Sequence, residues 1–200
     1  KDAFSKCSAL TSVDLTDCPM NPSNLLDLTL SEKSFSETGL QKIFIKAKDV
    51  MINDSCFYNC QSLNELTFDN VSNVTLCSSI FNMCNKLEKI HIEILNKLTI
   101  KANCFAGSVV KNICIQADSV EIENDAFKKN ASINSIIITA NEIKLANNVC
   151  ENCLNLKSIM LKATEKLDLG ESCFSGDTNL ESFKLNGDII IINKSCFNNC

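Results

Sequence analysis

The side chains of this sequence that could carry out chemistry are mostly thiols, because the chain holds 13 cysteines and only one histidine, His91. Cysteines and histidines can bind zinc, a thiolate beside a histidine can act as a nucleophile, and two thiols can form a disulfide. The segment SCFYNC at residues 55–60 is typical, with two cysteines on either side of two aromatic residues. Similar segments recur along the chain, so the spacing of the whole set must decide among these chemistries.

Catalytic and metal-binding roles are poorly supported by that spacing. Only Cys150 and Cys153 have the C-x2-C spacing of a zinc knuckle, and the sequence offers neither a second knuckle nor a nearby histidine. A nucleophile needs a base within reach, and His91 is the only histidine that could serve as one. The sequence also has no repeated carboxylate pair and no phosphate-binding glycine loop. We therefore expect no metal, no cofactor, no small-molecule substrate and no enzymatic activity. Disulfides stay open as an alternative, because stacked units would bring Cys60 and Cys84 within bridging distance.

A phenylalanine repeat runs through the whole chain. After a first interval of 31 residues, successive anchor positions follow one another at 22–24 residues. The anchors are Phe4, Phe35, Phe57, Phe81, Phe105, Phe127, Cys150, Phe174 and Phe197. Cys150 replaces phenylalanine in this series, and we expect either a void there or closer packing of the neighbouring units.

Apolar residues accompany each anchor with a period of two, which is typical of a strand with one buried face. Ile43 and Ile45 follow one anchor, and Val50 and Ile52 precede the next. Equivalent pairs recur in the other units. Each unit is thus predicted to form a strand, a turn with the anchor, a second strand and a polar return. Such a unit buries too little apolar surface to fold alone, so the units are expected to stack as a solenoid.

Most cysteines occupy two fixed positions of this repeat. Five lie three residues after the anchor, where other units have short polar residues able to bond the backbone of a turn: Cys7, Cys60, Cys84, Cys153 and Cys200. Four lie one residue before it, in what we interpret as a small buried slot: Cys56, Cys104, Cys173 and Cys196. These positions favour packing over reactivity as the role of the thiols.

The chain is predicted to be one array, residues 1–200, of about eight to nine units. The segment DCPMNPSN contains both prolines and predicts an inserted surface loop near residues 16–25. Two units are shortened by one residue and carry Gly39 and Gly107, which suggests turns that need a positive φ. Because neither end has a polar cap, we expect the array to be a part of a longer one.

The segment CFYNCQSLNELTF, with the related IFNMCNKLEKIHI and CFSGDTNLESFKL, resembles the BspA-like leucine-rich repeat, A/C-F-x-x-C-x-x-L-x-x-I-x-L. The resemblance covers nearly the whole chain. It implies a leucine-rich-repeat solenoid (horseshoe), β-rich with short helical or 3-10 turns. A parallel sheet would line its concave side and short strands its convex side. It also implies a location at the cell surface and a role in adhesion.

The composition narrows the partners further. A net charge of −5 disfavours nucleic acid, and without a run of 18 apolar residues we expect no membrane span within this stretch. The resemblance implies a protein ligand, and we expect it on the concave face, at the variable residues between the buried positions of the strand after each anchor. The candidate residues in that column are Phe44, Thr67, His91, Cys114, Ile137, Met160 and Lys184, following Asp14. Two hypotheses remain: a cell-surface or extracellular adhesion or ligand-binding protein, or an intracellular (cytoplasmic) scaffold that holds protein partners.

Overall fold

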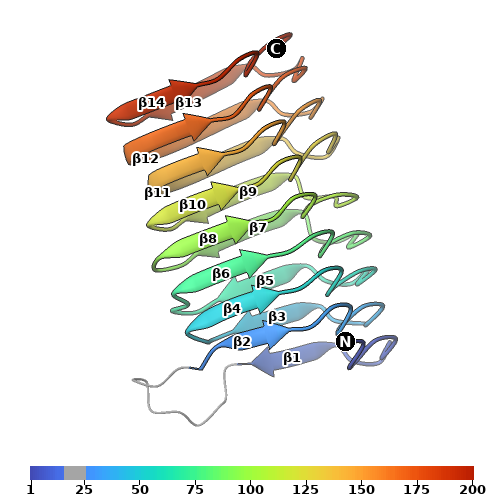
Figure 1. Ribbon diagram of the computed structural model, residues 1–200. Helices are drawn as coiled ribbons and strands as arrows, with labels where there is room; N and C mark the ends of the chain where they lie inside the picture. Colours follow the sequence, from blue (N-terminus) through green and yellow to red (C-terminus); the bar gives the residue numbers. More distant parts are fainter. Residues whose placement is uncertain (16–25) are drawn as a thin grey trace.

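The computed structural model describes residues 1–15 and 26–200, and all its regular structure is β-strand. Figure 1 shows the coils stacked in chain order along one axis, with the two termini at opposite ends and little curvature. The strands are β1 (Ser12–Leu15), β2 (Leu28–Leu30), β3 (Lys42–Ile45), β4 (Asp49–Ile52), β5 (Glu65–Phe68), β6 (Asn73–Leu76), β7 (Lys89–Glu93), β8 (Lys97–Ile100), β9 (Asn112–Gln116), β10 (Ser119–Ile122), β11 (Ser135–Leu145), β12 (Ser158–Leu169), β13 (Ser182–Asn186) and β14 (Ile189–Ile192). The insertion predicted near residues 16–25 lies outside the described residues.

Two parallel sheets face each other across the core. The first sheet consists of the strands that follow each turn, namely β1, β3, β5, β7, β9, the first halves of β11 and β12, and β13. The second sheet consists of β2, β4, β6, β8, β10, the second halves of β11 and β12, and β14. Strands β11 and β12 are long enough to pass from the first sheet into the second. Each unit of the repeat is therefore one coil of a parallel β-solenoid.

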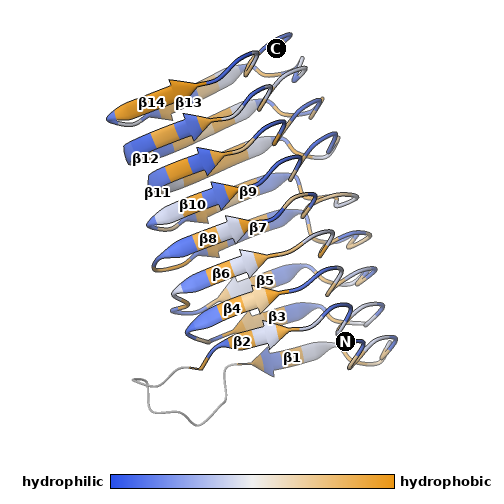
Figure 2. Ribbon diagram, viewed as in Figure 1, coloured by the Kyte–Doolittle hydropathy of each residue, from blue (hydrophilic) through white to orange (hydrophobic). Residues whose placement is uncertain are grey.

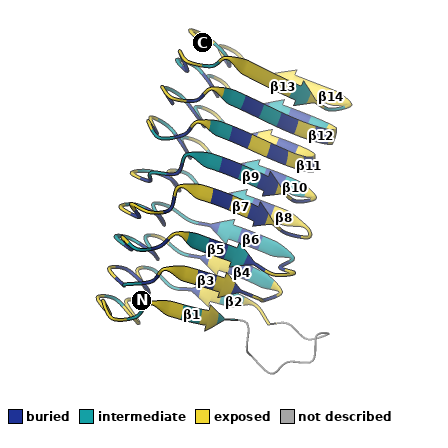
Figure 3. Ribbon diagram, turned by 180° about the vertical axis from the view of Figure 1, so that it is seen from behind, coloured by how far each residue is buried: buried dark blue, intermediate teal, exposed yellow. Residues whose placement is uncertain are grey.

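The predicted apolar pairs form the core between the sheets, except in the last coil, where Phe183, Ile190 and Ile192 are exposed. In β3 and β4 the buried positions are Ile43, Ile45, Val50 and Ile52, and the residues between them point to solvent. The alternation is visible along the central strands in Figures 2 and 3. Burial of apolar area is the main source of stability here, at roughly 25 cal/mol per Å².

The turn with the anchor is a third hydrogen-bonded face. In the coil of Phe57, Ser55 and Asn59 have φ of 53° and 57°, and the N–H groups of Ser55, Phe57 and Asn59 donate to the next coil. In every described turn, the residues two before and two after the anchor position have a positive, left-handed φ. No α- or 3-10 helix occurs in the described residues, so the short helical or 3-10 turns implied by the resemblance are non-helical turns here.

The two glycines predicted to allow a tighter turn differ from each other. Gly107 has a φ of 69°, as expected, but it occupies the left-handed place that every coil has, so shortening is not the cause. Gly39 does not have a left-handed φ; a Cβ there would clash with the backbone oxygen of Ser8. Close approach of the neighbouring coil explains this glycine.

The return from the first sheet to the second is not purely polar, in contrast to the prediction. One small or branched apolar residue per return is buried at the corner: Ala47, Val71, Ile94, Ala117, Ala140 and Ala163. This corner column closes the side of the core opposite the turns. None of the described residues forms a helix long and apolar enough to cross a membrane.

Candidate functional site

The anchor rings stack through the middle of the solenoid. Phe57 and Phe81 are fully buried with ring centroids 6.2 Å apart, and Phe105 and Phe127 follow with centroids 4.5 Å apart. The anchors of the inner coils are buried: Phe35, Phe57, Phe81, Phe105, Phe127 and Phe174. At the two ends of the array Phe4 is exposed and Phe197 is half-buried. Cys150 is also fully buried, between the coils of Phe127 and Phe174. It interrupts the ring series, and the neighbouring Val149 supplies a larger buried side chain there than Ala126 does one coil earlier.

The thiols three residues after the anchors donate hydrogen bonds to the preceding coil. Cys60 Sγ lies 3.0 Å from the carbonyl oxygen of Phe35, and Cys84 Sγ lies 3.0 Å from that of Phe57. Cys153 and Cys200 make the same contact with Phe127 and Phe174. A thiol suits this column because it is small, tolerates burial and adds a weak donor to a carbonyl that also accepts within its own turn, as that of Phe57 does from the N–H of Cys60.

The thiols one residue before the anchors fill a closed space. Cys56, Cys104 and Cys173 are fully buried, and Ile80 and Ala126 occupy the same place in other coils. Burial raises the pKa of Cys56 to about 11, with the hydroxyl of Ser34, 3.3 Å from its Sγ, opposing part of that rise. Burial also raises the pKa of Cys104 and Cys173, so these three thiols stay protonated and poorly nucleophilic at neutral pH. In the last coil a hydrogen bond from Cys173 lowers the pKa of Cys196 instead.

No disulfide or metal site forms among the described residues. The twelve cysteines there are free, and no group of three or more His, Cys, Asp or Glu residues could hold a metal ion. Burial raises the pKa of Cys84 to about 12, and it also raises the pKa of Cys60. The sequence-based interpretation of these columns as packing positions agrees with this arrangement.

Thiol labelling should follow burial. With a maleimide at neutral pH, we expect Cys7 and Cys200 to react first and the half-buried Cys77 and Cys114 more slowly. Eight thiols should react only after unfolding: Cys56, Cys60, Cys84, Cys104, Cys150, Cys153, Cys173 and Cys196. Peptide mass mapping before and after denaturation measures this, and rapid labelling of Cys56 or Cys104 in the native protein would contradict the packing described above.

The residues predicted to contact a partner lie on the outer surface of the first sheet, in one column across neighbouring strands. The ladder pairs Phe44 with Thr67, and further along it pairs Cys114 with Ile137 and Ile137 with Met160. His91 pairs with Cys114, and Lys184 with Met160. None of these seven predicted residues is buried. Phe44 and Ile137 have 40% and 39% of their surface exposed, and Met160 is half-buried.

The outer surface over β9, β11 and β12 is largely uncharged. Around the apolar centre of Cys114, Ile137 and Met160 stand serine, asparagine, glutamine and threonine side chains, and Lys162 is the one charged residue on these strand segments in the first sheet. We call the surface of Cys114, Ile137 and Met160 the apolar patch. Its three residues belong to the column that the sequence predicts as an interaction surface.

The same column is interrupted between Thr67 and His91. Strand β5 pairs with β3, and β7 pairs with β9, but no backbone ladder joins β5 to β7. A cavity of about 390 Å³ lies at this interruption. The sequence analysis missed it, because both strands carry the normal apolar pattern.

The outer surface of the second sheet carries paired charges instead. Lys97 and Lys144 contact Glu121 at 2.8 and 3.0 Å, and these hydrogen bonds lower the pKa of Glu121 to about 2. Lys166 and Asp168 form another pair at 3.4 Å. Charges that neutralise one another within the surface leave fewer groups for a partner.

These features define a class, the parallel β-solenoid built from leucine-rich repeats. The model of the BspA type leucine rich repeat region (6 copies) matches residues 1–97 and again residues 98–200, so the chain belongs to this family. A solved structure with a similar fold is that of a leucine-rich repeat protein from Bacteroides ovatus ATCC 8483, with 17% sequence identity and a TM-score of 0.50. The match covers 99% of this chain and 60% of that one, so this chain spans about 60% of the length of the matched protein. No curated protein matches the chain.

Proposed function

We propose that the chain is a non-catalytic module that binds a protein ligand, and that it acts at the cell surface in adhesion or ligand binding. The observation that carries the proposal is the apolar patch on a flat, exposed strand surface, since exposed apolar patches with polar rims are typical of interaction surfaces. Membership in the BspA type repeat family supports the surface location by analogy.

The second candidate is an intracellular scaffold with the same patch. The free state of the twelve described cysteines favours it, because disulfides form readily in oxidising compartments and thiols persist in reducing ones. Burial of eight of these thiols also protects them from oxidation, so the two candidates share one binding surface and differ in compartment. Localisation of the tagged protein in its own cells separates them.

The binding test replaces the centre of the apolar patch. The double variant Ile137→Asp and Met160→Lys places two charges on adjacent strands without changing buried residues. We expect a loss of at least about tenfold in affinity for a protein ligand, about 1.4 kcal/mol, measured by surface plasmon resonance with the immobilised chain.

A matched control makes the same charge changes on the other sheet. Thr75→Asp and Thr99→Lys lie on adjacent strands of the second sheet, also outside the core. This variant should bind as the wild type does. Equal binding by the wild type and the Ile137/Met160 variant would remove the patch from the binding site.

A further inference from the structure

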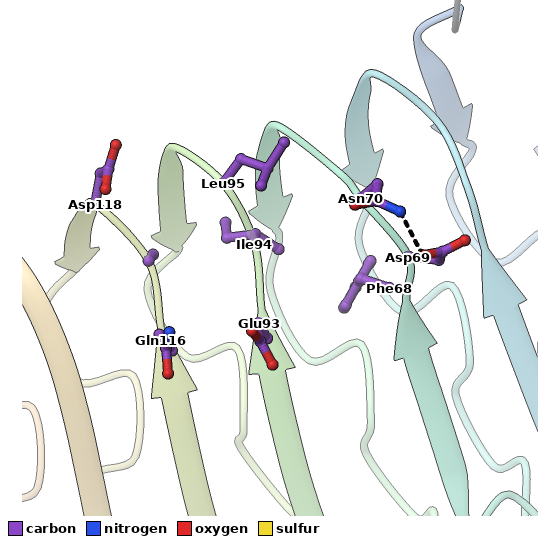
Figure 4. Close-up of a pocket in the computed structure, with 9 residues that line it drawn as sticks. Phe68, Asp69, Asn70, Glu93, Ile94, Leu95, Gln116 and Asp118 are labelled. Atoms are coloured by element: carbon purple, nitrogen blue, oxygen red, sulfur yellow. Dashed lines mark hydrogen bonds between the residues drawn. The ribbon is translucent and has the colours of Figure 1, made fainter. Parts of the chain in front are cut away.

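A groove crosses the first sheet at the missing ladder between β5 and β7, and it continues into a second hollow at the end of the strands. The two cavities measure about 390 and 440 Å³ and share Phe68 and Glu93. Figure 4 shows the second one, with Asp69, Glu93 and Asp118 carried by consecutive coils. We call these joined cavities the β5/β7 groove. It is distinct from the apolar patch, which starts on the far side of His91.

The groove forms because the backbone hydrogen bonds directly after β5 and directly after β7 run in opposite directions along the solenoid. The N–H of Asp69 donates to Ile45 in the preceding coil, whereas the N–H of Ile94 donates to Gln116 in the following coil. The returns also bury their corner residues at different places, Val71 three residues after Phe68 and Ile94 two residues after Ile92. The backbones of the two coils are therefore held apart at the ends of β5 and β7, and they meet again where the N–H of Leu95 donates to the carbonyl oxygen of Val71 at 2.9 Å.

The width of the groove limits what can enter it. Cα atoms of β5 and β7 lie within 8 Å of one another. An inserted strand would need two strand spacings, about 9.6 Å. A partner backbone can thus lie across the groove, but only its side chains can enter between the strands.

The groove combines an apolar floor with an acidic rim. Phe68, Ile94 and Ala117 form buried parts of the floor, and Leu95 stands at its edge with 54% of its surface exposed. Four carboxylates line the two cavities, Glu65, Asp69, Glu93 and Asp118, against Lys89 and His91.

Two of these carboxylates already have lysine partners. Glu65 lies 2.7 Å from Lys42, and Asp69 lies 3.2 Å from Lys46. Glu93 has only His91 beside it, at 3.9 Å, and Asp118 forms no ion pair with a described residue. The groove therefore offers two uncompensated carboxylates beside apolar surface, which suits a side chain with an aliphatic stem and a positive head.

We propose that the β5/β7 groove receives a basic segment of a protein partner, with one lysine or arginine side chain beside Glu93 and a second beside Asp118. The aliphatic stems of these side chains pack on the apolar surface of Phe68 and Leu95. Their positive heads bond the two carboxylates. This inference rests on the proposed function for the partner being a protein, but the groove itself is tested without that partner.

The test measures binding of short fluorescent peptides to the whole chain by anisotropy. The probes alternate threonine with arginine, with lysine or with glutamate. We expect the arginine or the lysine peptide to bind with a dissociation constant below about 1 mM, and the glutamate peptide not to bind. The stronger of the two basic peptides identifies the preferred side chain.

Charge variants distinguish the groove from general attraction to an acidic protein. Glu93→Gln with Asp118→Asn should weaken binding of the basic peptide at least about tenfold, which is about 1.4 kcal/mol. The control Glu171→Gln with Glu181→Gln makes an equal change of charge on other coils and should leave affinity within about twofold.

Two results would overturn the proposal: no binding of either basic peptide at millimolar concentration, or equal losses in the groove variant and the control. The Ile137/Met160 variant should bind the basic peptide as the wild type does. The experiments can therefore reject the proposal for the apolar patch without rejecting the proposal for the groove, and the reverse.

Discussion

Replacement of Phe81 by alanine should lower the free energy of unfolding by about 3–5 kcal/mol, the usual range for removing a buried phenylalanine. Phe81 is fully buried, with ring centroids 6.2 Å from Phe57 and 5.6 Å from Phe105. The variant loses contacts to both neighbouring coils. In a solenoid, stability depends on each interface between adjacent units, so the loss cannot be shared over a larger core.

Urea unfolding followed by circular dichroism measures this effect. Phe44→Ala is the matched control, because Phe44 lies on the outer surface of the first sheet and is 40% exposed. It should cost less than about 1 kcal/mol. A similar loss in both variants would mean that the anchor stack does not hold the coils together.

The second large effect concerns Asp177, which is fully buried three residues after the anchor Phe174, at the position that Cys60 and Cys153 occupy in other coils. Its Oδ1 accepts a hydrogen bond of 2.7 Å from the N–H of Cys153, and its Oδ2 has no partner. Burial raises the pKa of Asp177 from 3.8 to about 8, with the charge of Glu151 adding to the rise and the Cys153 N–H opposing it.

The sign of the pH dependence follows from that raised pKa. Between pH of about 4 and 8 the native carboxyl keeps its proton while the unfolded one has lost it, so the native state binds more protons. Stability should therefore fall as pH rises through this window, by at most about 1.4 kcal/mol per pH unit. The contribution is fully present below the unfolded pKa and is lost above the native one.

Asp177→Asn should remove this dependence and stabilise the protein at pH of about 8 by a few kcal/mol. Asparagine fits this column, because Asn130 holds the same place in its coil and donates from Nδ2 to Ser108 Oγ at 3.0 Å. The two proteins should converge in stability near pH 4. Urea unfolding across this pH range measures the difference.

Asp54→Asn provides the control, since Asp54 also accepts a backbone N–H from the next coil, that of Ser78 at 2.9 Å, but is exposed. It should change stability by less than about 1 kcal/mol at any pH in the range. If Asp177→Asn shows no gain at high pH relative to this control, Asp177 is ionised in the native protein without penalty.

The fold was largely predictable from the sequence, because the buried residues repeat in register. Pairs such as Ile43 and Ile45 identify a strand by themselves, and the interval of 22–24 residues identifies the solenoid. The cysteine columns were predictable for the same reason: Thr38 and Asn130 stand where Cys60 stands, which indicates a common structural place.

Other features depend on backbone geometry that apolar periodicity does not record. The left-handed turn residues include Met83 and Lys129 as well as Asn59, so only the enrichment of asparagine, serine and glycine at those places could have indicated them. The corner column was hidden because the returns carry mostly polar residues around their one buried residue each. The β5/β7 groove arises from which return residue is buried. Residues 69–72 contain one apolar residue, Val71, whereas residues 94–96 offer both Ile94 and Leu95, between which periodicity does not choose.

We propose that a protein ligand binds the outer surface of the first sheet, while the thiols and anchors serve the core. Photo-cross-linking from a benzophenone amino acid tests this, with the probe placed at Ile137 on the first sheet or at Thr75 on the second. Both positions lie in central strand columns outside the core. We predict that a ligand retained by the wild-type chain cross-links from position 137 and not from position 75. Cross-linking from position 75 alone, or equally from both, would contradict this account.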